Sequence, residues 1–175
     1  MKTLNQLIHE VEQARSAFIQ SVSGLSFEQV NFKPAADVWS VLQNTEHIVR
    51  AEQSGVSGIF KALDGIANHR PVWEGIPVHQ GLSIEEIVDK TWQTKEQVPE
   101  IAAPIWGGSI DYWIAMLKSQ SILLAELGKL LEGRNLEEII YPHPISGPLN
   151  IYQRIEFLRF HLNRHQSQVE RLNVR

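Results

Sequence analysis

Hydrophobic residues recur at helical spacing in four long segments of this chain. In the first segment the apolar positions follow the spacing of an amphipathic helix and are Leu4, Leu7, Ile8, Val11, Ala14, Phe18 and Val22. Since Ser23-Gly24 follows as a stop signal, this pattern predicts a helix over about residues 3–22. A second long helix is predicted from Trp39 or Ser40 to Leu63, where Asp64-Gly65 ends it.

Two more long helices and one short helix follow. The third long helix is predicted over about 109–131, and the last begins after Asn150, which is suited to cap it. The core stripe of this last helix contains Ile151, Ile155, Leu158, Leu162, Val169 and Leu172. A shorter helix is predicted from 84 to about 97, because Ser83-Ile84-Glu85-Glu86 has the form of a capping box ahead of an apolar run.

The remaining segments lack a convincing strand pattern. Residues 26–34 form a connector with room for one helical turn, and residues 67–81 are irregular. Two prolines and a glycine favour a turn rather than a strand over 141–148, although 138–141 can pair briefly. The sequence therefore predicts an all-α fold in one domain spanning residues 1–175. The long helices, in antiparallel succession, are expected to pack as a bundle.

Composition and charge exclude several classes of function. The 175 residues are 43% hydrophobic and 21% charged, which is typical of a globular protein. The formal net charge is -4, and no cluster of Lys and Arg is interleaved with aromatic residues, so nucleic-acid binding is not expected. The N-terminus lacks the apolar run of a signal peptide, and no stretch approaches the length of a membrane span. We expect a cytoplasmic protein that does not contact membranes.

The absence of cysteine limits the chemistry further. With no thiol in the chain, a disulfide framework, a thiolate metal site and a nucleophilic cysteine are all excluded. A metal ion must be held by His, Asp or Glu. Thiol chemistry would require a thiol supplied by a cofactor or substrate.

The pair His161 and His165 is the strongest candidate for a metal site. Residues four apart on a helix lie on the same face, so both imidazoles can reach one ion. A catalytic site of the zinc type needs about three protein ligands and an open position. The best third donor is His47 on the second long helix. Small residues follow on the same flank and make space there: Ala51, Ser54, Gly55 and Gly58.

The remaining histidines and the nearby carboxylates have weaker claims. His9 is expected in solvent, His69 and His79 in an irregular loop, and His143 in a structural role between two prolines. Glu46 and Glu52 flank His47 in the sequence, and either is positioned to hold the outer ring nitrogen of a ligand.

Two parts of the sequence resemble a known family. Trp39-Ser40 precedes the helix that contains Glu46-His47 and Glu52. His143-Pro144 and Gly147-Pro148-Leu149 precede the run Phe160-His161-Leu162-Asn163-Arg164-His165-Gln166. This pattern resembles the DinB-like superfamily of metal-binding four-helix bundles, and the helix order extends the resemblance over nearly the whole chain. Carried over residue by residue, the family's three-histidine site falls on His47, His161 and His165. The long segment 67–108, with its short helix, departs from the compact family pattern.

The resemblance also implies chemistry. Characterised members include bacillithiol S-transferases and the mycothiol-dependent maleylpyruvate isomerase. A divalent metal ion, commonly nickel or zinc, a small-molecule substrate, a low-molecular-weight thiol as cosubstrate and a homodimer are therefore expected. The leading interpretation is a metal-dependent transferase that activates the thiol, or a hydrolase that activates water at the same site. The alternative is a non-catalytic bundle that binds a metal or small ligand, for example in a stress response.

The irregular loop 67–81 carries one further expectation. Long loops without secondary structure are usually functional, and Trp73 between Pro71 and Gly75 has no local reason to be there. We expect this loop near the metal opening with Trp73 at the edge of the pocket. A Trp73 that fills the end of the bundle is the competing interpretation.

Overall fold

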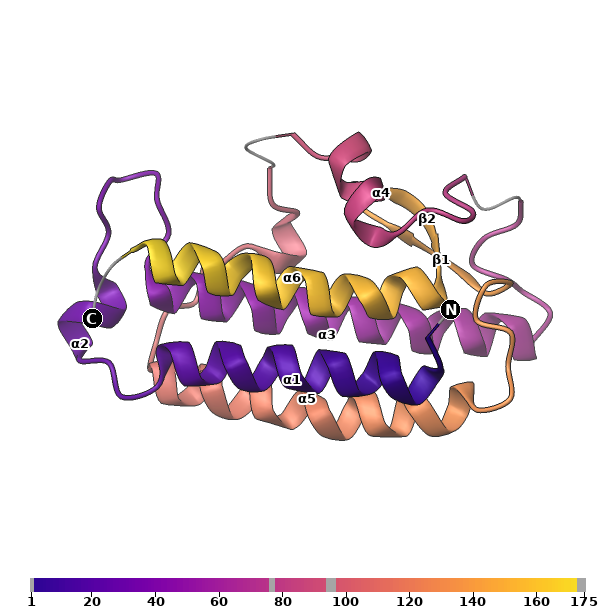
Figure 1. Cartoon of the computed structure of the whole chain (residues 1–175), viewed down its shortest axis with the longest axis horizontal. Helices are drawn as coiled ribbons and strands as arrows, with labels where there is room; N and C mark the ends of the chain where they lie inside the picture. The colour runs from indigo at the N-terminus through magenta and orange to yellow at the C-terminus, as the bar shows by residue number, and fades with distance from the viewer. Residues whose placement is uncertain (1, 76–77, 94–96, 173–175) are drawn as a thin grey trace.

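The computed structural model describes residues 2–75, 78–93 and 97–172. Four long helices dominate it, as Figure 1 shows: α1 (Leu4–Val22), α3 (Val41–Ala67), α5 (Ile110–Leu131) and α6 (Ile151–Arg171). The shorter elements are α2 (Phe27–Asn31), α4 (Ile84–Thr91), the 3-10 turn η1 (Glu100–Ala102) and the strands β1 (Ile140–His143) and β2 (Gly147–Asn150). The prediction of an all-α bundle is confirmed.

The four long helices pack side by side in a square. Each contacts two others: α1 lies against α5 and α6, and α3 lies against α5 and α6 (Figure 1). Their order along the chain is not fully antiparallel as expected, because α3 and α5 run in the same direction. The long connection between them, which contains α4 and η1, brings the chain back to the end of the bundle where α3 began.

Polar caps fix where most helices begin. Ser40, Ser83 and Asn150 each accept a hydrogen bond from the backbone three residues ahead, and a glutamine or glutamate at that position bonds back. The predicted end of α3 at Asp64-Gly65 is wrong, since the helix continues to Ala67. Gly65 serves packing instead, because a Cβ there would lie 2.5 Å from the carbonyl oxygen of Arg70.

The short helix and the following segment also differ from expectation. α4 ends at Thr91 rather than near residue 97, since Trp92 is already extended. Residues 94–96 lie outside the described part of the chain.

A β-hairpin replaces the turn predicted over 141–148. Strands β1 and β2 pair antiparallel, with Tyr141 opposite Leu149 and Pro142 opposite Pro148. In a two-stranded ladder every second residue turns its N–H outward, so a facing pair of prolines need not break a ladder hydrogen bond. For that reason, the rule that proline argues against a β-strand gives the wrong prediction for this segment.

Two apolar clusters hold these elements in place. The buried faces of the four long helices form the main core. A smaller cluster contains Ile84, Ile87, Val88, Leu149 and Phe157, and it fastens α4 to the hairpin and to α6. No helix among the described residues is both long and apolar enough to cross a membrane.

Candidate metal centre

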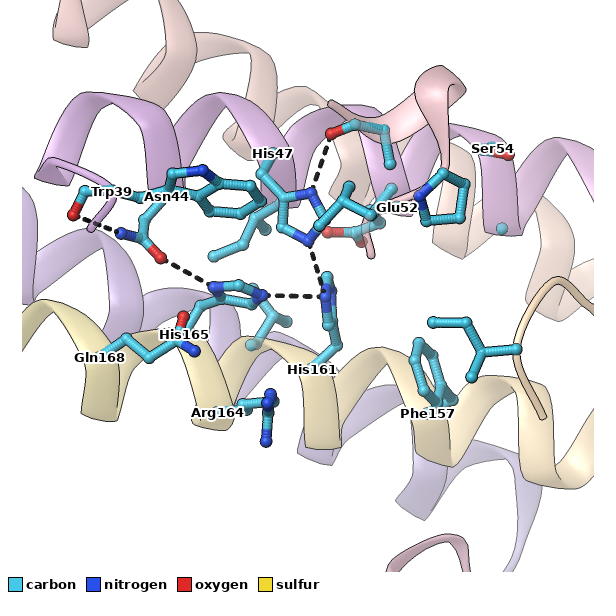
Figure 2. Close-up of a pocket in the computed structure, with 18 of the residues that line it drawn as sticks. Trp39, Asn44, His47, Glu52, Ser54, Phe157, His161, Arg164, His165 and Gln168 are labelled. Carbon is cyan, nitrogen blue, oxygen red and sulfur yellow. Dashed lines mark hydrogen bonds between the residues drawn. The ribbon is translucent and has the colours of Figure 1, made fainter. Parts of the chain in front are cut away.

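His47 on α3 and the pair His161 and His165 on α6 point toward one another across the helix interface (Figure 2). The Nε2 atom of His161 lies 3.0 Å from Nε2 of His47 and 3.0 Å from Nε2 of His165. All three side chains are buried, with no more than 7% of their surface exposed. The structure therefore brings together the three residues that the sequence singled out.

The outer ring nitrogens of two of these histidines are fixed by acceptors. Nδ1 of His47 donates to the carbonyl oxygen of Ala102 at 2.8 Å, and Nδ1 of His165 donates to Oδ1 of Asn44 at 2.9 Å. The Asn44 amide is itself oriented, because its Nδ2 donates to the carbonyl of Ser40. With protons on both Nδ1 atoms, the neutral rings of His47 and His165 present lone pairs on Nε2.

This set of donors fits a divalent cation. A neutral His161 can donate at most one N–H from Nε2, which satisfies only one of the two lone pairs that face it. A cation satisfies all three imidazoles at once. Two nitrogens bound to one ion at about 2.1 Å lie about 3.0 Å apart at right angles and about 3.4 Å apart in a tetrahedral arrangement, so the two Nε2 separations of 3.0 Å are close to those of a shared ion.

Asn44 acts on the site only through His165, which makes it a positioning residue. Asn44→Ala is expected to weaken metal affinity about 10- to 100-fold, as is typical when a partner that orients a ligand is removed. Titration of the variant against a competing chelator gives the affinity. Thr45→Ala is a suitable control, since among the described residues that hydroxyl bonds to the carbonyl of Val41 within the same helix and to no ligand histidine. Equal affinities in the two variants would contradict the role given to Asn44.

Burial keeps the three imidazoles neutral. It is the main cause that lowers the pKa of His47 to about 4, and it lowers the pKa of His161 and His165 well below 6.5. The neighbouring histidines add to the effect at His161 and His165. Since only the neutral ring donates to a metal, the folded site is ready for an ion at pH 7 without prior loss of protons.

The lowered pKa values predict an unusual pH dependence of metal binding. Protons compete for a ligand only as the pH approaches the pKa of that ligand in the folded protein, so affinity should change little between pH 7 and 6. It should then fall steeply as the pH drops toward about 4. Equilibrium dialysis at pH 7, 6, 5 and 4 measures this. A loss already complete at pH 6 would mean ordinary histidine pKa values, and a flat affinity down to pH 4 would point to carboxylate ligands.

Glu46 holds the segment that covers His47 rather than a ring nitrogen. Its buried carboxylate accepts hydrogen bonds from the backbone N–H groups of Ile105, Trp106 and Gly107 at 2.7 to 2.9 Å. The same segment supplies the Ala102 carbonyl to His47. Glu46 therefore positions His47 indirectly, and the expectation that it binds a ligand ring directly is wrong.

Glu52 is also committed elsewhere. Its carboxylate forms an ion pair with the guanidinium of Arg15 on α1, and both side chains are at most 3% exposed. Burial raises the pKa of Glu52, and the charge of Arg15 opposes this. The ion pair ties α1 to α3 through Oε1 of Glu52, while Oε2 is buried without a hydrogen-bond partner among the described residues. No hydrogen bond joins Glu52 to a ring of the three histidines in the described part of the chain, so the expectation that it orients a ligand ring is wrong.

A pocket of about 630 Å³ opens onto the three histidines. Its walls come from the segment before α3, from residues 97–102, from the hairpin turn and from α6. Trp39 packs against the site, with its ring centroid 4.9 Å from that of His47 and 6.3 Å from that of His165. A volume of this size accommodates a small organic molecule.

The expectation for the loop 67–81 is wrong. None of its described residues lines the pocket, and Trp73 is 38% exposed; residues 76–77 lie outside the described part. The loop follows the C-terminal end of α3 at Ala67, about five and a half helical turns along the helix from His47, so it covers a different part of the bundle (Figure 1). Trp39 and Trp92 are the tryptophans that line the pocket.

Tryptophan fluorescence should therefore report metal binding through Trp39. Added Ni²⁺ or Cu²⁺ is expected to quench wild-type emission, and Trp39→Phe should lose the largest share of that quenching because the ring lies against His47 and His165. Trp73→Phe is the matched control and should leave quenching nearly unchanged. Equal effects of the two substitutions would contradict this geometry.

The other four histidines do not join the cluster. His9 and His69 are exposed, as expected. His79 bonds through Nε2 to the carbonyl of Ser146 and so links the loop to the hairpin. Nδ1 of His143 accepts the backbone N–H groups of Ile145 and Ser146, a structural role in the hairpin turn, yet His143 also lines the pocket.

Comparisons with known proteins agree with this fold. The sequence model described as the DinB superfamily matches residues 10–169. An uncharacterized protein of Bacillus subtilis strain 168, YuaE, is 26% identical over 164 residues, which cover 91% of this chain and 93% of that protein. The crystal structure of a conserved protein from Enterococcus faecalis matches with a TM-score of 0.60 and 15% identity, over 98% of this chain and 95% of that chain. This last likeness concerns the fold alone.

Proposed function

Because the chain belongs to the DinB superfamily and gathers three buried imidazoles, we propose that it is a divalent-metal-dependent transferase acting on a low-molecular-weight thiol. His47, His161 and His165 would hold the ion, with nickel or zinc the best matches to three nitrogen ligands. A divalent ion lowers the pKa of a thiol bound to it and so supplies a thiolate near neutral pH.

One observation carries this proposal. The Nε2 lone pairs of His47 and His165 face a pocket that a small molecule can enter, rather than a closed apolar wall. A bundle that merely stores or senses a metal needs no such cavity beside it. The pocket therefore favours catalysis over the non-catalytic alternative.

The carboxylates of the pocket favour the thiol over water as the nucleophile. Hydrolysis usually depends on a general base close to the attacking water. Among the described residues that line the pocket, the carboxylates are Asp37 at the outer segment and Glu52. Glu52 is ion-paired with Arg15 through Oε1, its Oε2 is buried without a hydrogen-bond partner among the described residues, and Asp37 is exposed. A thiol that ionises on the metal needs no such base.

The chain's own residues would orient the reactants. Asn44 and the Ala102 carbonyl fix the rings of His165 and His47, and Trp39 shields those rings from solvent. Phe157 stacks on His161 with ring centroids 5.5 Å apart and forms an apolar wall next to it. These contacts keep the ligand rings rigid and limit water at the reacting end of the pocket.

A conjugation assay tests the proposal. Protein loaded with Zn²⁺ or Ni²⁺ is mixed with cysteine, glutathione or another small thiol and with 1-chloro-2,4-dinitrobenzene as the electrophile. We expect a metal-dependent rate at least about tenfold above the protein-free reaction, and His161→Ala should lose it. Metal-loaded protein that hydrolyses p-nitrophenyl acetate but conjugates no thiol would instead establish the hydrolase. Activity in neither assay over a broad set of thiols would favour the non-catalytic alternative.

A further inference from the structure

Arg154 on α6 is a buried cation with no counterion among the residues that the structure describes. The residue is 5% exposed, and it lines the same pocket as the three histidines. Its Nη1 atom is fully buried without a hydrogen-bond partner, and across the described part of the chain no carboxylate lies within ion-pair distance of the guanidinium. A buried charge without a partner is costly, so such residues usually bind a ligand or ion of opposite charge.

The structure makes room for this guanidinium. Its carbon lies over the ring of Tyr141, 5.3 Å from the centroid. Tyr141 in turn packs so closely on α3 that a Cβ at Gly58 would lie 1.9 Å from the ring, and a Cβ at Gly55 would lie 3.4 Å from Nη2 of Arg154. Gly55 and Gly58 on α3 therefore accommodate Arg154 and the tyrosine that packs on it.

The buried carboxylates on the same helices do not neutralise Arg154. Glu52, one turn before Gly55 on α3, pairs with Arg15. Glu156 on α6 pairs with Lys2. Burial lowers the pKa of Arg154 to about 10, which still leaves the group positively charged at neutral pH.

His143 provides a second donor in the pocket that Arg154 lines. Burial is the main cause that lowers the pKa of His143 to about 3, and the charge of Arg154 contributes, so the ring is neutral. Since Nδ1 accepts the N–H groups of Ile145 and Ser146, the ring proton is on Nε2. His143 thus offers one N–H donor, while Arg154 offers a positive charge and several N–H donors.

The distance between Arg154 and the metal centre defines the shape of a ligand. Arg154 precedes His161 by two helical turns on the same face, which corresponds to about 10 Å along the helix axis. Phe157 and Leu158 line the pocket between the two positions. A molecule that spans them has an anionic end, a mostly apolar middle and a reacting end.

We propose that Arg154, assisted by His143, binds the carboxylate of the small molecule whose other end reaches His47, His161 and His165. This proposal rests on the proposed function, because it names the chemical class of the thiol or electrophile used at that site. The ligand is an elongated organic acid of roughly 10 Å.

Matched pairs of acid and alcohol provide the probes. Isothermal titration calorimetry compares 6-mercaptohexanoate with 6-mercapto-1-hexanol on zinc-loaded protein, and hexanoate with 1-hexanol on metal-free protein. A charge-assisted contact to a buried guanidinium predicts that each acid binds about 10- to 100-fold more tightly than its alcohol. Equal affinities of acid and alcohol in both pairs would overturn the proposal.

Variants assign the preference to one side chain. Arg154→Met should bring the ratio of acid to alcohol affinity close to one, and Arg154→Lys should retain part of it. Arg159→Met is the matched control, since Arg159 is on the same helix, pairs with Glu85 and is absent from the pocket. An unchanged preference in Arg154→Met, or its loss in Arg159→Met, would contradict the assignment. If Arg154→Met does not fold, the wild-type pairs and Arg154→Lys still decide the question.

Two further arms separate the possible explanations. In the first arm, wild type binds inorganic phosphate as tightly as hexanoate, and the Arg154→Met variant no longer binds it. That result would identify a site for a free anion and overturn the organic-acid proposal. The metal-free pair is independent of the metal. If the protein prefers hexanoate to 1-hexanol but binds no metal, the Arg154 site is supported and the proposed function fails. If it binds metal but shows no preference for either acid, the metal site is supported and the Arg154 proposal fails.

Discussion

The His161→Ala variant is expected to lose its divalent ion. His161 is the central member of the cluster, with its Nε2 atom 3.0 Å from Nε2 of both other histidines. Its removal leaves two donors on different helices, and we expect affinity to fall by at least about 100-fold, a cost of about 2.7 kcal/mol. Plasma mass spectrometry of the purified protein, with competition titrations, measures the change.

Two controls accompany this prediction. His9→Ala removes an exposed histidine of α1 and should leave the metal content at about one ion per chain. Circular dichroism should show the same helical content in His161→Ala as in wild type, since the apolar cores of the bundle do not depend on the ion. Full metal content in His161→Ala would show that the ion, if any, is bound elsewhere.

The Glu52→Ala variant is expected to lose about 3 to 5 kcal/mol of unfolding free energy. Arg15 is 1% exposed, so without Glu52 its buried guanidinium keeps only the half-exposed Glu12 as a described carboxylate partner, beside the hydroxyl of Ser121. Burial by itself would lower the pKa of Arg15, and the charges of Glu52 and Glu12 more than offset this and raise it. Denaturation in urea, monitored by circular dichroism, gives the change in stability.

Glu12→Ala provides the comparison. Glu12 also contacts Arg15, but its side chain is 35% exposed, so its loss should cost no more than about 1 kcal/mol. The double variant Arg15→Met with Glu52→Leu should recover much of the stability, because it removes both buried charges together. A Glu52→Ala protein as stable as Glu12→Ala would mean that the buried pair contributes little.

The candidate site was largely predictable because its geometry is local. His161 and His165 are one helical turn apart, and helix periodicity alone places them on one face. The assignment of His47 depended on the small residues that follow it and on the resemblance of its surroundings to a family motif. Those small residues do lie at a close contact, but the contact is with Tyr141 and Arg154, which no local pattern connects to α3.

The errors concern segments whose positions are set by distant contacts. The local sequence predicts Trp73 at the pocket because it offers no other reason for a tryptophan there, whereas the pocket is lined by Trp39 and Trp92 from other segments. The hydrogen-bond acceptors for His47 and His165 are the backbone carbonyl of Ala102 and the side chain of Asn44. Every residue has a backbone carbonyl, so the sequence does not indicate which one accepts from His47. Glu46 and Glu52 were recognised as important, but their partners lie 37 to 61 residues away in the chain.

The same reasoning explains the differences in the fold. The helix starts carry their signals within three residues, and the structure has Ser40, Ser83 and Asn150 as caps where expected. The predicted end of α3 is too early because a glycine is typical of a helix stop, while Gly65 instead allows Arg70 to pack closely. The hairpin was missed because the effect of Pro142 depends on its pairing with Pro148 across the ladder.

Anomalous diffraction is the most direct test of the central claim, that His47, His161 and His165 hold a divalent ion. Crystals of the protein loaded with Ni²⁺ or Zn²⁺ are measured on both sides of the absorption edge of the metal. We expect one anomalous peak per chain, about 2.0 to 2.1 Å from the Nε2 atoms of all three histidines. A map without a peak at the three imidazoles, or with its metal peak among carboxylates elsewhere on the chain, would contradict the claim.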